Sequence, residues 1–577
     1  MEKVIVALDC GTSGCRAMAF SIQGVCLYKS YRELPRYYPA PGWVEQEALE
    51  LWALLKSCLQ EVLVWAGPDN VLTLGITNQR ETVIAWDKNS GVPLSPALVW
   101  QCRRTAPFCL QNKGFSPYLF AKTGLFLDPY FSASKMLWLL NQKNQLSEKI
   151  KRGSLCLGTV DTWILYMITA GKLFATDPTN ASRTLLYNIR LKNWDPELCN
   201  LFDIPINALA QIKPSIGEWG FTDPSQTGKA LPIGAVLGDQ QAAFFAQGQG
   251  TRSFIKCTYG TGLFLMGEGS LTHHPAPQIL PDFILNKSSL NYLTANNSQA
   301  GGSEVSADPL LAKVQAPSII GSGLIPKTSA NETVKVALAK KPVLPLSHLS
   351  QNLSENTQDD APKNQPVLLT TVAWADEMNF AYAFEGALFN GGSCIQWMRD
   401  ALGLIKDAGQ SEIDALSLPH SGSVYFIPAL TGLGAPIWDA SARGAWMGLS
   451  PSSSRAHLVR SVLESLAYQV AQVVGVWGRP VEELRADGGA TQNAFLMQWQ
   501  ADVLGLPVCV TREKEATALG VAAAAAVSAG LIDRQTLFTW NPVVKEYWPG
   551  THTSLAQTEF EVWKKVEQRC LNWNFSA

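Results

Sequence analysis

The chain has 577 residues, of which 47% are hydrophobic and only 16% are charged, and its formal net charge is −2. This length exceeds what one hydrophobic core supports, so we expect two or more domains. A near-neutral charge gives neither the basic surface that binds nucleic acid nor a polybasic patch for a membrane. The composition therefore argues against both kinds of partner.

The twelve cysteines are scattered singly from Cys10 to Cys570, without a CxxC pair, and no histidine lies in a Gly-rich or Asp-bearing motif. This distribution favours buried free thiols in a reducing compartment over a disulfide framework or a zinc site. The first ten residues, MEKVIVALDC, lack the positive start and long apolar region of a signal peptide. The Ala-rich run at 520–532 is shorter than the ~20 residues that span a bilayer. We therefore expect a soluble, cytoplasmic protein.

In chain order, the first elements form a β-hairpin. Residues 4–8 predict a strand that ends at Asp9, and small residues at 11–14 predict a tight turn before strands at 16–21 and 25–29. A helix at about 46–64 and a strand at 72–77 follow. Strands and helices alternate from there on, which is typical of an α/β protein.

The opening hairpin recurs near residue 254. Residues 253–259 predict a strand, Gly260-Thr261-Gly262 a turn, and 263–267 a returning strand. We interpret this as an internal duplication in which one hairpin opens each of two related domains, at about 1–250 and 251–577. A nucleotide would then lie between the domains, with its phosphates held by both turns.

Residues 271–366 differ in composition from the rest of the chain. They are rich in Ser, Asn, Ala, Pro and Lys, and they contain none of the 19 tryptophans and no arginine. Such a segment buries too little apolar surface to offset its ordering entropy. We expect a long, mobile insertion in the second domain, with tracts such as 346–365 disordered and strand character resuming at 367–373.

Three small-residue turns at predicted strand ends are suited to holding phosphates. DCGTSGCR at 9–16 offers backbone N–H groups, the hydroxyls of Thr12 and Ser13, and the charge of Arg16. In YGTG at 259–262 and ADGGA at 486–490, glycines let a phosphate or a flat ring approach the backbone. Each is also typical of an ordinary turn, but three at strand ends favour nucleotide binding.

Polar and aromatic side chains gather at other predicted element ends. The strand end GITNQRE at 75–81 carries Arg80 and Glu81, which suit a polyol but also fit a surface ion pair. ALVWQCRRT at 97–105 carries Trp100, for which a place in the core is an equal alternative. Tyr130 lies near the start of a helix whose apolar positions recur from Met136 onward.

The stretch LGDQQAAFFAQ at 237–247 places Asp239 directly before an apolar, helix-forming run. Aspartate is a preferred N-cap residue because its oxygen accepts unpaired N–H groups of the first turn. A carboxylate at that position can equally accept a proton from an alcohol during phosphoryl transfer. The two roles are compatible.

Together these motifs resemble the FGGY carbohydrate kinases, and among them the members that phosphorylate glycerol. The resemblance extends from residue 4 to about 563, apart from the insertion. Nine motifs occur in the family's order, namely GITNQRET, WQCRRT, DPYFSASK, GTVDTW, TDPTNASRT, GDQQAAFFAQ, TYGTG, GLGAPIWDASARG and DGGATQNAFLMQ. The resemblance implies two actin-like ATPase (ribonuclease H-like) domains around a central cleft. It also implies ATP-dependent phosphorylation of glycerol to sn-glycerol 3-phosphate.

The resemblance further implies roles for single residues. Asp239 is implied as the general base, and Asp9 and Asp239 as the residues that hold Mg²⁺. The implied substrate contacts are Arg80, Glu81, Trp100, Tyr130, Asp239, Gln240 and Phe264. The implied ATP contacts are Thr12, Ser13, Arg16 and Thr261 for the phosphates, and Gly392, Gln396, Gly489 and Asn493 for the nucleoside. A homodimer or homotetramer is implied as well.

The sequence also departs from the family pattern. Cys10 stands where Gln is usual, and Gly14 and Cys15 stand where serines are frequent. The stretch SQTGKA at 225–230 lacks the arginine of the family's fructose-1,6-bisphosphate loop, so that regulation is not expected. Two alternatives remain open: a kinase of another small polyol or ketose, and a non-catalytic, nucleotide-binding regulator of actin-like fold.

Overall fold

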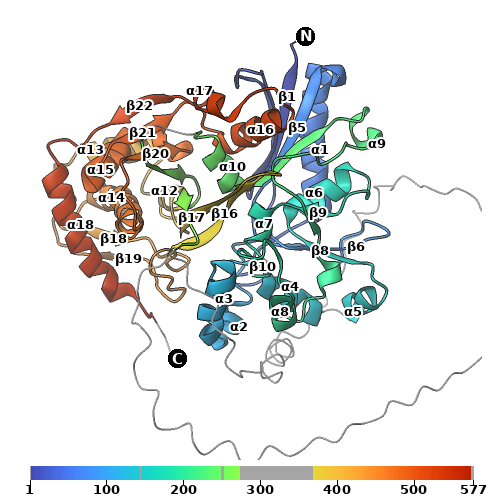
Figure 1. Cartoon of the computed structure of the whole chain (residues 1–577). Coiled ribbons are helices and arrows are strands. Elements are labelled where there is room, and N and C mark those ends of the chain that lie inside the picture. Colours follow the sequence, from blue (N-terminus) through green and yellow to red (C-terminus); the bar gives the residue numbers. More distant parts are fainter. Residues whose placement is uncertain (1, 143, 249–251, 273–367, 574–577) are drawn as a thin grey trace, which may run out of the picture. The chain divides into compact units, whose positions relative to one another are not determined.

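The computed structural model describes residues 2–142, 144–248, 252–272 and 368–573 (Figure 1). The expected mobile insertion, including the tract 346–365, lies almost wholly outside these residues. Both predicted hairpins lie within them, each as part of a mixed sheet.

The first sheet has five strands in the order β13-β5-β1-β2-β3. The central strand β1 is antiparallel to β2 and parallel to β5, and β13 is parallel to β5. The strands are β1 (Val4–Cys10), β2 (Gly14–Phe20), β3 (Cys26–Glu33), β5 (Val71–Asn78) and β13 (Ile233–Gly238).

Helices cover both faces of this sheet, which explains the unbroken apolar character of β1. Val4, Val6 and Leu8 pack in one hydrophobic cluster with α1 (Ala48–Ala66). The alternate residues Ile5 and Ala7 pack in another cluster with α16 (Ala516–Ser528). The sheet is therefore the middle layer of a helix–sheet–helix sandwich.

Helix α16 comes from the far end of the chain, yet it packs on the first sheet and on α10 (Asp239–Phe245) (Figure 1). The approach is close because a glycine stands at each contact: Gly75 of β5 lies against the α16 backbone, and Gly520 of α16 lies against the α10 backbone. A Cβ on Gly75 would lie 2.4 Å from the carbonyl oxygen of Val521, and one on Gly520 only 1.8 Å from that of Ala242. The Ala-rich run at 520–532 thus contributes a buried helix, and no helix in the described part of the chain is long and apolar enough to cross a membrane.

The second sheet has seven strands in the order β16-β17-β15-β14-β20-β21-β22. Here β14 is antiparallel to β15 and parallel to β20, the same relation that β1 has to β2 and β5. The repeated hairpin that the sequence predicts is therefore present in both sheets. The strands are β14 (Phe254–Tyr259), β15 (Leu263–Gly269), β16 (Leu369–Ala375), β17 (Phe380–Leu388), β20 (Glu483–Asp487), β21 (Val508–Thr511) and β22 (Val543–Tyr547).

The remaining elements complete the two parts of the chain. Before α10 these are the strands β4 (Glu45–Gln46), β6 (Ile84–Asp87), β7 (Ala97–Leu98), β8 (Leu155–Gly158), β9 (Ala175–Thr176), β10 (Tyr187–Asn188), β11 (Asn193–Trp194) and β12 (Gln211–Ile212) and the helices α2 (Ala106–Gln111), α3 (Ser116–Thr123), α4 (Ser132–Gln142), α5 (Asn144–Lys151), α6 (Val160–Ile168), α7 (Pro178–Ala181), α8 (Pro196–Leu201) and α9 (Pro224–Thr227). After β17 they are β18 (Tyr425–Ile427), β19 (Ala445–Met447), α12 (Gly392–Asp400), α13 (Ala408–Leu416), α14 (Arg455–Gly475), α15 (Ala494–Leu504), α17 (Leu537–Trp540) and α18 (Thr553–Glu567).

Candidate functional site

A cavity of about 440 Å³, which we call the cleft, lies where the two hairpin turns and the first residues of α10 and α16 meet. Most of the residues that the sequence singles out line it. They are Asp9, Thr12, Ser13, Arg16, Arg80, Glu81, Trp100, Tyr130, Asp239, Gln240, Thr261, Phe264 and Gly489.

Three predicted nucleoside residues are not part of this lining. Gln396 is exposed on α12, and the side chain of Asn493 caps α15 by accepting the N–H of Leu496 at 2.9 Å. The N–H of Gly392 donates to the carbonyl oxygen of Gly260 at 2.8 Å, so this glycine braces the second turn. The cleft therefore unites the substrate and phosphate candidates but not these three.

Asp239 does not cap α10, so the capping interpretation was wrong. Gly238 keeps an extended conformation (φ −62°, ψ 152°) and is the N-cap, and Asp239 is the first helical residue. Among the N–H groups of the first turn, the Asp239 Oδ1 accepts that of its neighbour Gln240, at 2.7 Å. The carboxylate still lies in the first turn, where the helix dipole favours negative charge.

Two carboxylates, Asp9 and Asp239, face the cleft under opposing influences. Burial raises the pKa of each, and a nearby guanidinium opposes the rise. The Arg16 Nε lies 3.4 Å from the Asp9 Oδ2, and the Arg80 Nε lies 3.2 Å from the Asp239 Oδ1. The Asp239 side chain is 27% exposed, so its oxygens are accessible from the cleft.

Behind Asp239 lies a buried ion cluster of Arg80, Glu81, Arg183 and Glu385. None of the four is more than 3% exposed. Glu385 accepts hydrogen bonds from Arg80 Nη1 at 2.6 Å, from Arg80 Nη2 at 3.0 Å and from Arg183 Nη2 at 3.1 Å. Arg183 Nε donates to Glu81 Oε1 at 2.6 Å. Burial would raise the pKa of Glu385, but Arg183 and Arg80 hold it below its ordinary value.

Glu81 has a left-handed backbone, with φ at 61°. A non-glycine residue in this region is strained, and such residues are often found at functional sites. Its conformation turns the chain directly after β5, so that Arg80 and Glu81 both reach the cleft.

An aromatic wall of Trp100, Tyr130 and Phe264 faces the carboxylates. The Trp100 ring meets Tyr130 edge-on at a centroid distance of 5.5 Å and Phe264 at 6.1 Å. Trp100 is half-buried, and its Nε1 donates to the Thr12 Oγ1 at 2.8 Å. Trp100 therefore connects the aromatic wall to the first phosphate turn.

Sequence reasoning missed several residues that the fold brings to the site. Glu385 and Arg183 carry no local signal, although Arg183 belongs to the motif TDPTNASRT. The cleft is also lined by Thr258 and, directly before and at the start of α16, by Lys514, Glu515, Ala516 and Thr517, whereas Asp487 and Gly488 in the lining belong to the predicted turn ADGGA. Arg16 forms an ion pair with Glu515, which ties the first turn to that helix.

Gln240 is held by a residue that does not line the cleft. The Lys256 Nζ donates to the Gln240 Oε1 at 2.8 Å. Lys256 is fully buried, and this burial lowers its pKa. The amide group of Gln240 thus presents its N–H₂ side to other partners.

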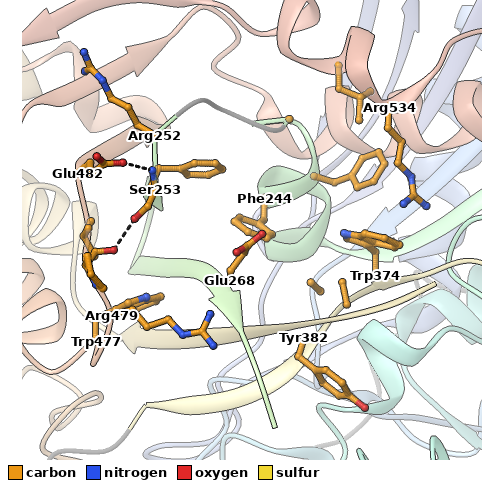
Figure 2. Close-up of a pocket in the computed structure, with 18 residues that line it drawn as sticks. Phe244, Arg252, Ser253, Glu268, Trp374, Tyr382, Trp477, Arg479, Glu482 and Arg534 are labelled. Atoms are coloured by element: carbon orange, nitrogen blue, oxygen red, sulfur yellow. Dashed lines mark hydrogen bonds between the residues drawn. The ribbon is translucent and has the colours of Figure 1, made fainter. Parts of the chain in front are cut away.

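A larger cavity, about 740 Å³, opens at the other end of α10 (Figure 2). Its walls include Phe244 and Trp374, but none of the predicted site residues. Among its polar groups, Glu482 accepts the N–H of Ser253 at 2.7 Å (Figure 2), and Arg534 pairs with Asp376, which lies outside the lining. The cleft is therefore the better candidate for chemistry.

Comparison with known proteins shows the family of the chain. The N-terminal domain model of the FGGY family of carbohydrate kinases matches residues 4–246, and the C-terminal domain model matches 350–529. A glycerol kinase of Acaryochloris marina is 38% identical, covering 99% of this chain and 98% of its own length. A glycerol kinase of Aquifex aeolicus is 37% identical, with 99% of both chains covered.

Solved structures share the fold. The Plasmodium falciparum glycerol kinase with ADP has a TM-score of 0.74 and 25% identity, covering 99% of this chain and 98% of that one. A xylulose kinase from Lactobacillus acidophilus has a TM-score of 0.73 at 17% identity, with 98% of both chains covered. This second likeness concerns the fold alone.

Proposed function

The chain belongs to the FGGY family of carbohydrate kinases, and on this premise we propose that it transfers the γ-phosphoryl group of ATP to glycerol. The product is sn-glycerol 3-phosphate. Its fold is the two-domain, actin-like kinase fold, and we propose a domain boundary near residue 250. One observation carries the proposal: a single cleft holds Asp239, the aromatic wall and both phosphate turns.

The lining suits the two faces of glycerol. Arg80 donates hydrogen bonds, Glu81 and Asp239 accept them, and Gln240 donates through its amide, so three hydroxyls find partners. The C–H face of the molecule would lie against Trp100 and Phe264, with Tyr130 beside them. A polyol is held because its polar and apolar sides are both matched.

Asp239 is the proposed general base. A primary alcohol is a weak nucleophile, so a carboxylate within hydrogen-bond reach accepts its proton as the oxygen attacks the γ-phosphorus. The raised pKa of Asp239 makes its carboxylate a stronger base than an ordinary aspartate. The γ-phosphoryl group is transferred to the oxygen, and ADP departs.

The turns that line the cleft suit the nucleotide phosphates. Thr12, Ser13, Thr261 and Gly489 offer hydroxyl and N–H donors, and Arg16 adds positive charge. Gly392, Gln396 and Asn493, beyond the cleft lining, are the proposed contacts of the nucleoside.

Asp9 and Asp239 are the residues that would hold Mg²⁺. Both are carboxylates whose pKa burial raises, so a cation beside them offsets the cost of their charge. Among the described residues no cluster of three or more His, Cys, Asp or Glu side chains forms a closed metal cage. Mg²⁺ is held in kinases by one or two carboxylates together with phosphate oxygens, and it neutralises charge on those oxygens when bound.

Two other functions remain distinguishable alternatives: a kinase of another small polyol or ketose, and a non-catalytic nucleotide-binding regulator. Neither alternative explains the combination of base, aromatic wall and phosphate turns as directly as glycerol phosphorylation does.

We further propose that the enzyme is cytoplasmic and that it acts as a homo-oligomer.

Steady-state kinetics test the proposal. ADP release is measured with ATP–Mg²⁺ and a panel of glycerol, other polyols and ketoses, and glycerol is expected to give the highest kcat/KM. Asp239→Asn should lower kcat by about 10²- to 10⁴-fold, the usual worth of a general base. Asp376→Asn, outside the cleft, is the matched control. Folded wild-type protein without glycerol-dependent ADP release would contradict the function, and near-normal kcat in Asp239→Asn would contradict the base.

A further inference from the structure

Two buried thiols face each other at the root of the first phosphate turn. Cys10 ends β1 and Cys15 lies in β2, and they are directly opposite in the antiparallel ladder. Their Sγ atoms are 3.0 Å apart, and both side chains are fully buried. The turn that they flank, closed by the N–H of Gly11 donating to the carbonyl oxygen of Gly14 at 3.0 Å, lines the cleft.

The geometry suits a covalent bond between these sulfurs. Directly opposite residues of an antiparallel pair have Cα atoms about 4.5–5.5 Å apart, within the span that a disulfide bridges. The sulfurs need to approach by only about 1 Å to reach bonding distance. In the described part of the chain, no other two cysteine sulfurs form a hydrogen bond with each other.

We propose that Cys10 and Cys15 are a modification site, at which a reversible disulfide weakens nucleotide binding by the cleft. The effect on catalysis rests on the proposed function, but formation of the bond does not. The oxidant belongs to the class of low-molecular-weight disulfides, of which oxidised glutathione is the probe.

The exchange takes two steps. One cysteine thiolate attacks the small disulfide, forming a mixed disulfide and releasing one small thiolate. The other cysteine thiolate then attacks the protein sulfur of the mixed disulfide, which forms the Cys10–Cys15 bond and releases the second small thiolate. The protein loses two protons and two electrons, and the oxidant is reduced to two thiols.

Burial sets the rate of this exchange. Both sulfurs are fully buried, so an oxidant does not reach them while the hairpin is closed. The turn beyond the thiols is more open, since Gly11 and Thr12 are half-buried and Ser13 is exposed. Attack therefore follows opening of the hairpin tip and is slower than at an exposed thiol.

The position of the bond determines its consequence. Asp9 precedes Cys10 and Arg16 follows Cys15, so drawing the two strands together shifts a carboxylate and a guanidinium that line the cleft. The same movement shifts Thr12, whose hydroxyl accepts the N–H of Trp100. Loss of one charge-assisted hydrogen bond to phosphate lowers affinity about tenfold, so we expect that increase in the KM for ATP.

The test uses the full chain, reduced and then incubated in glutathione buffers of increasing oxidised fraction. Trypsin releases both cysteines in one peptide, residues 4–16. The oxidised peptide should be about 2 Da lighter and should resist alkylation until it is reduced. The KM for ATP should rise about tenfold in parallel and recover with dithiothreitol.

Variants separate this pair from its neighbour. Cys10→Ser and Cys15→Ser should each stay insensitive to oxidised glutathione. Cys58→Ser is the matched control, because the Cys58 thiol is buried and donates to the carbonyl oxygen of Cys15 at 3.5 Å; it should respond like the wild type.

Three results would overturn the inference: a peptide that never becomes oxidised, a disulfide that leaves nucleotide affinity unchanged, or a response that survives in Cys10→Ser. Titration with ADP reads affinity without turnover. A reduced protein that releases no ADP with glycerol would therefore refute the proposed function, while peptide mass and ADP titration would still decide the disulfide.

Discussion

Replacing Glu385 by glutamine would test whether the buried ion cluster positions the base. Glu385 is fully buried on β17 and receives three guanidinium hydrogen bonds of 2.6–3.1 Å. With Arg80, Arg183 and Glu81 it forms a set of two positive and two negative charges. Glutamine keeps the shape but leaves one positive charge uncompensated.

The magnitude follows from this imbalance. Removing one partner of a buried ion pair costs about 3–5 kcal/mol, because the remaining charge has no counter-ion. Arg80 can recover part of that cost through Asp239, whose Oδ1 is already 3.2 Å from its Nε. The closer pairing would lower the pKa of Asp239 and weaken it as a base. We therefore expect kcat to fall about tenfold or more, and the acid limb of the pH profile to move to lower pH.

The assay is the pH dependence of kcat/KM, with urea unfolding in parallel. Glu464→Gln is the matched control, since Glu464 is buried and pairs with Arg460 at 2.6 Å but does not line the cleft. Glu464→Gln should leave the acid limb of the pH profile unchanged. If Glu385→Gln alters stability alone, with kcat and the acid limb as in wild type, Glu385 is structural and the positioning argument is refuted.

Two further predictions concern stability. Gly520→Ala should lower the free energy of unfolding, measured in urea, by about 1–3 kcal/mol, because its Cβ would lie 1.8 Å from the carbonyl oxygen of Ala242. Gly475→Ala is the control and should leave the free energy of unfolding unchanged, because its Cβ would meet no neighbouring atom within 4 Å. Equal losses in the two variants would refute the packing argument. Burial raises the pKa of Asp161, Glu464 and Glu567 to about 7 each, so the folded chain binds more protons than the unfolded chain between about pH 4 and 7. Their stabilisation is complete below the unfolded pKa and is lost as the pH rises through about 7. The thermal midpoint should therefore be higher at pH 6 than at pH 8, because each group adds about 1 kcal/mol more to the free energy of unfolding at pH 6, and Asp161→Asn should reduce the difference.

Local features of the site could be predicted from the sequence because their signals are local. The turn at residues 11–14 is bounded by apolar runs, and both strands of its hairpin fall within two residues of their expected starts. Arg80 and Glu81 come within three residues of the end of a strand, so their place at a sheet edge follows from the strand itself. The first residue of α10 was harder to predict, because an aspartate before an apolar run fits both the N-cap and the first helical position.

Long-range partners could not be predicted in this way. Glu385 is 305 residues from Arg80, and its strand, FAYAFEGAL, contains no turn or glycine-rich motif that marks a site. The Ala-rich helix α16 carries no periodic apolar stripe that would show which sheet it covers. Its position depends on Gly75 of β5, which has no Cβ and therefore lets the α16 backbone approach closely. Such pairings arise only from the tertiary fold.

The sheet itself explains why these particular residues meet. β1, β5 and β13 are adjacent and parallel, so their carboxyl ends lie at one edge, and Asp9, Arg80 and Asp239 stand at those ends. Neighbouring strands are about 4.8 Å apart, so the backbones of β1 and β13 are roughly 10 Å apart, and the side chains of Asp9 and Asp239 reach from them into one cleft. Because three strands of one sheet set this arrangement, the two proposed Mg²⁺ ligands, of which Asp239 is also the proposed base, keep their relation whatever the second sheet contributes.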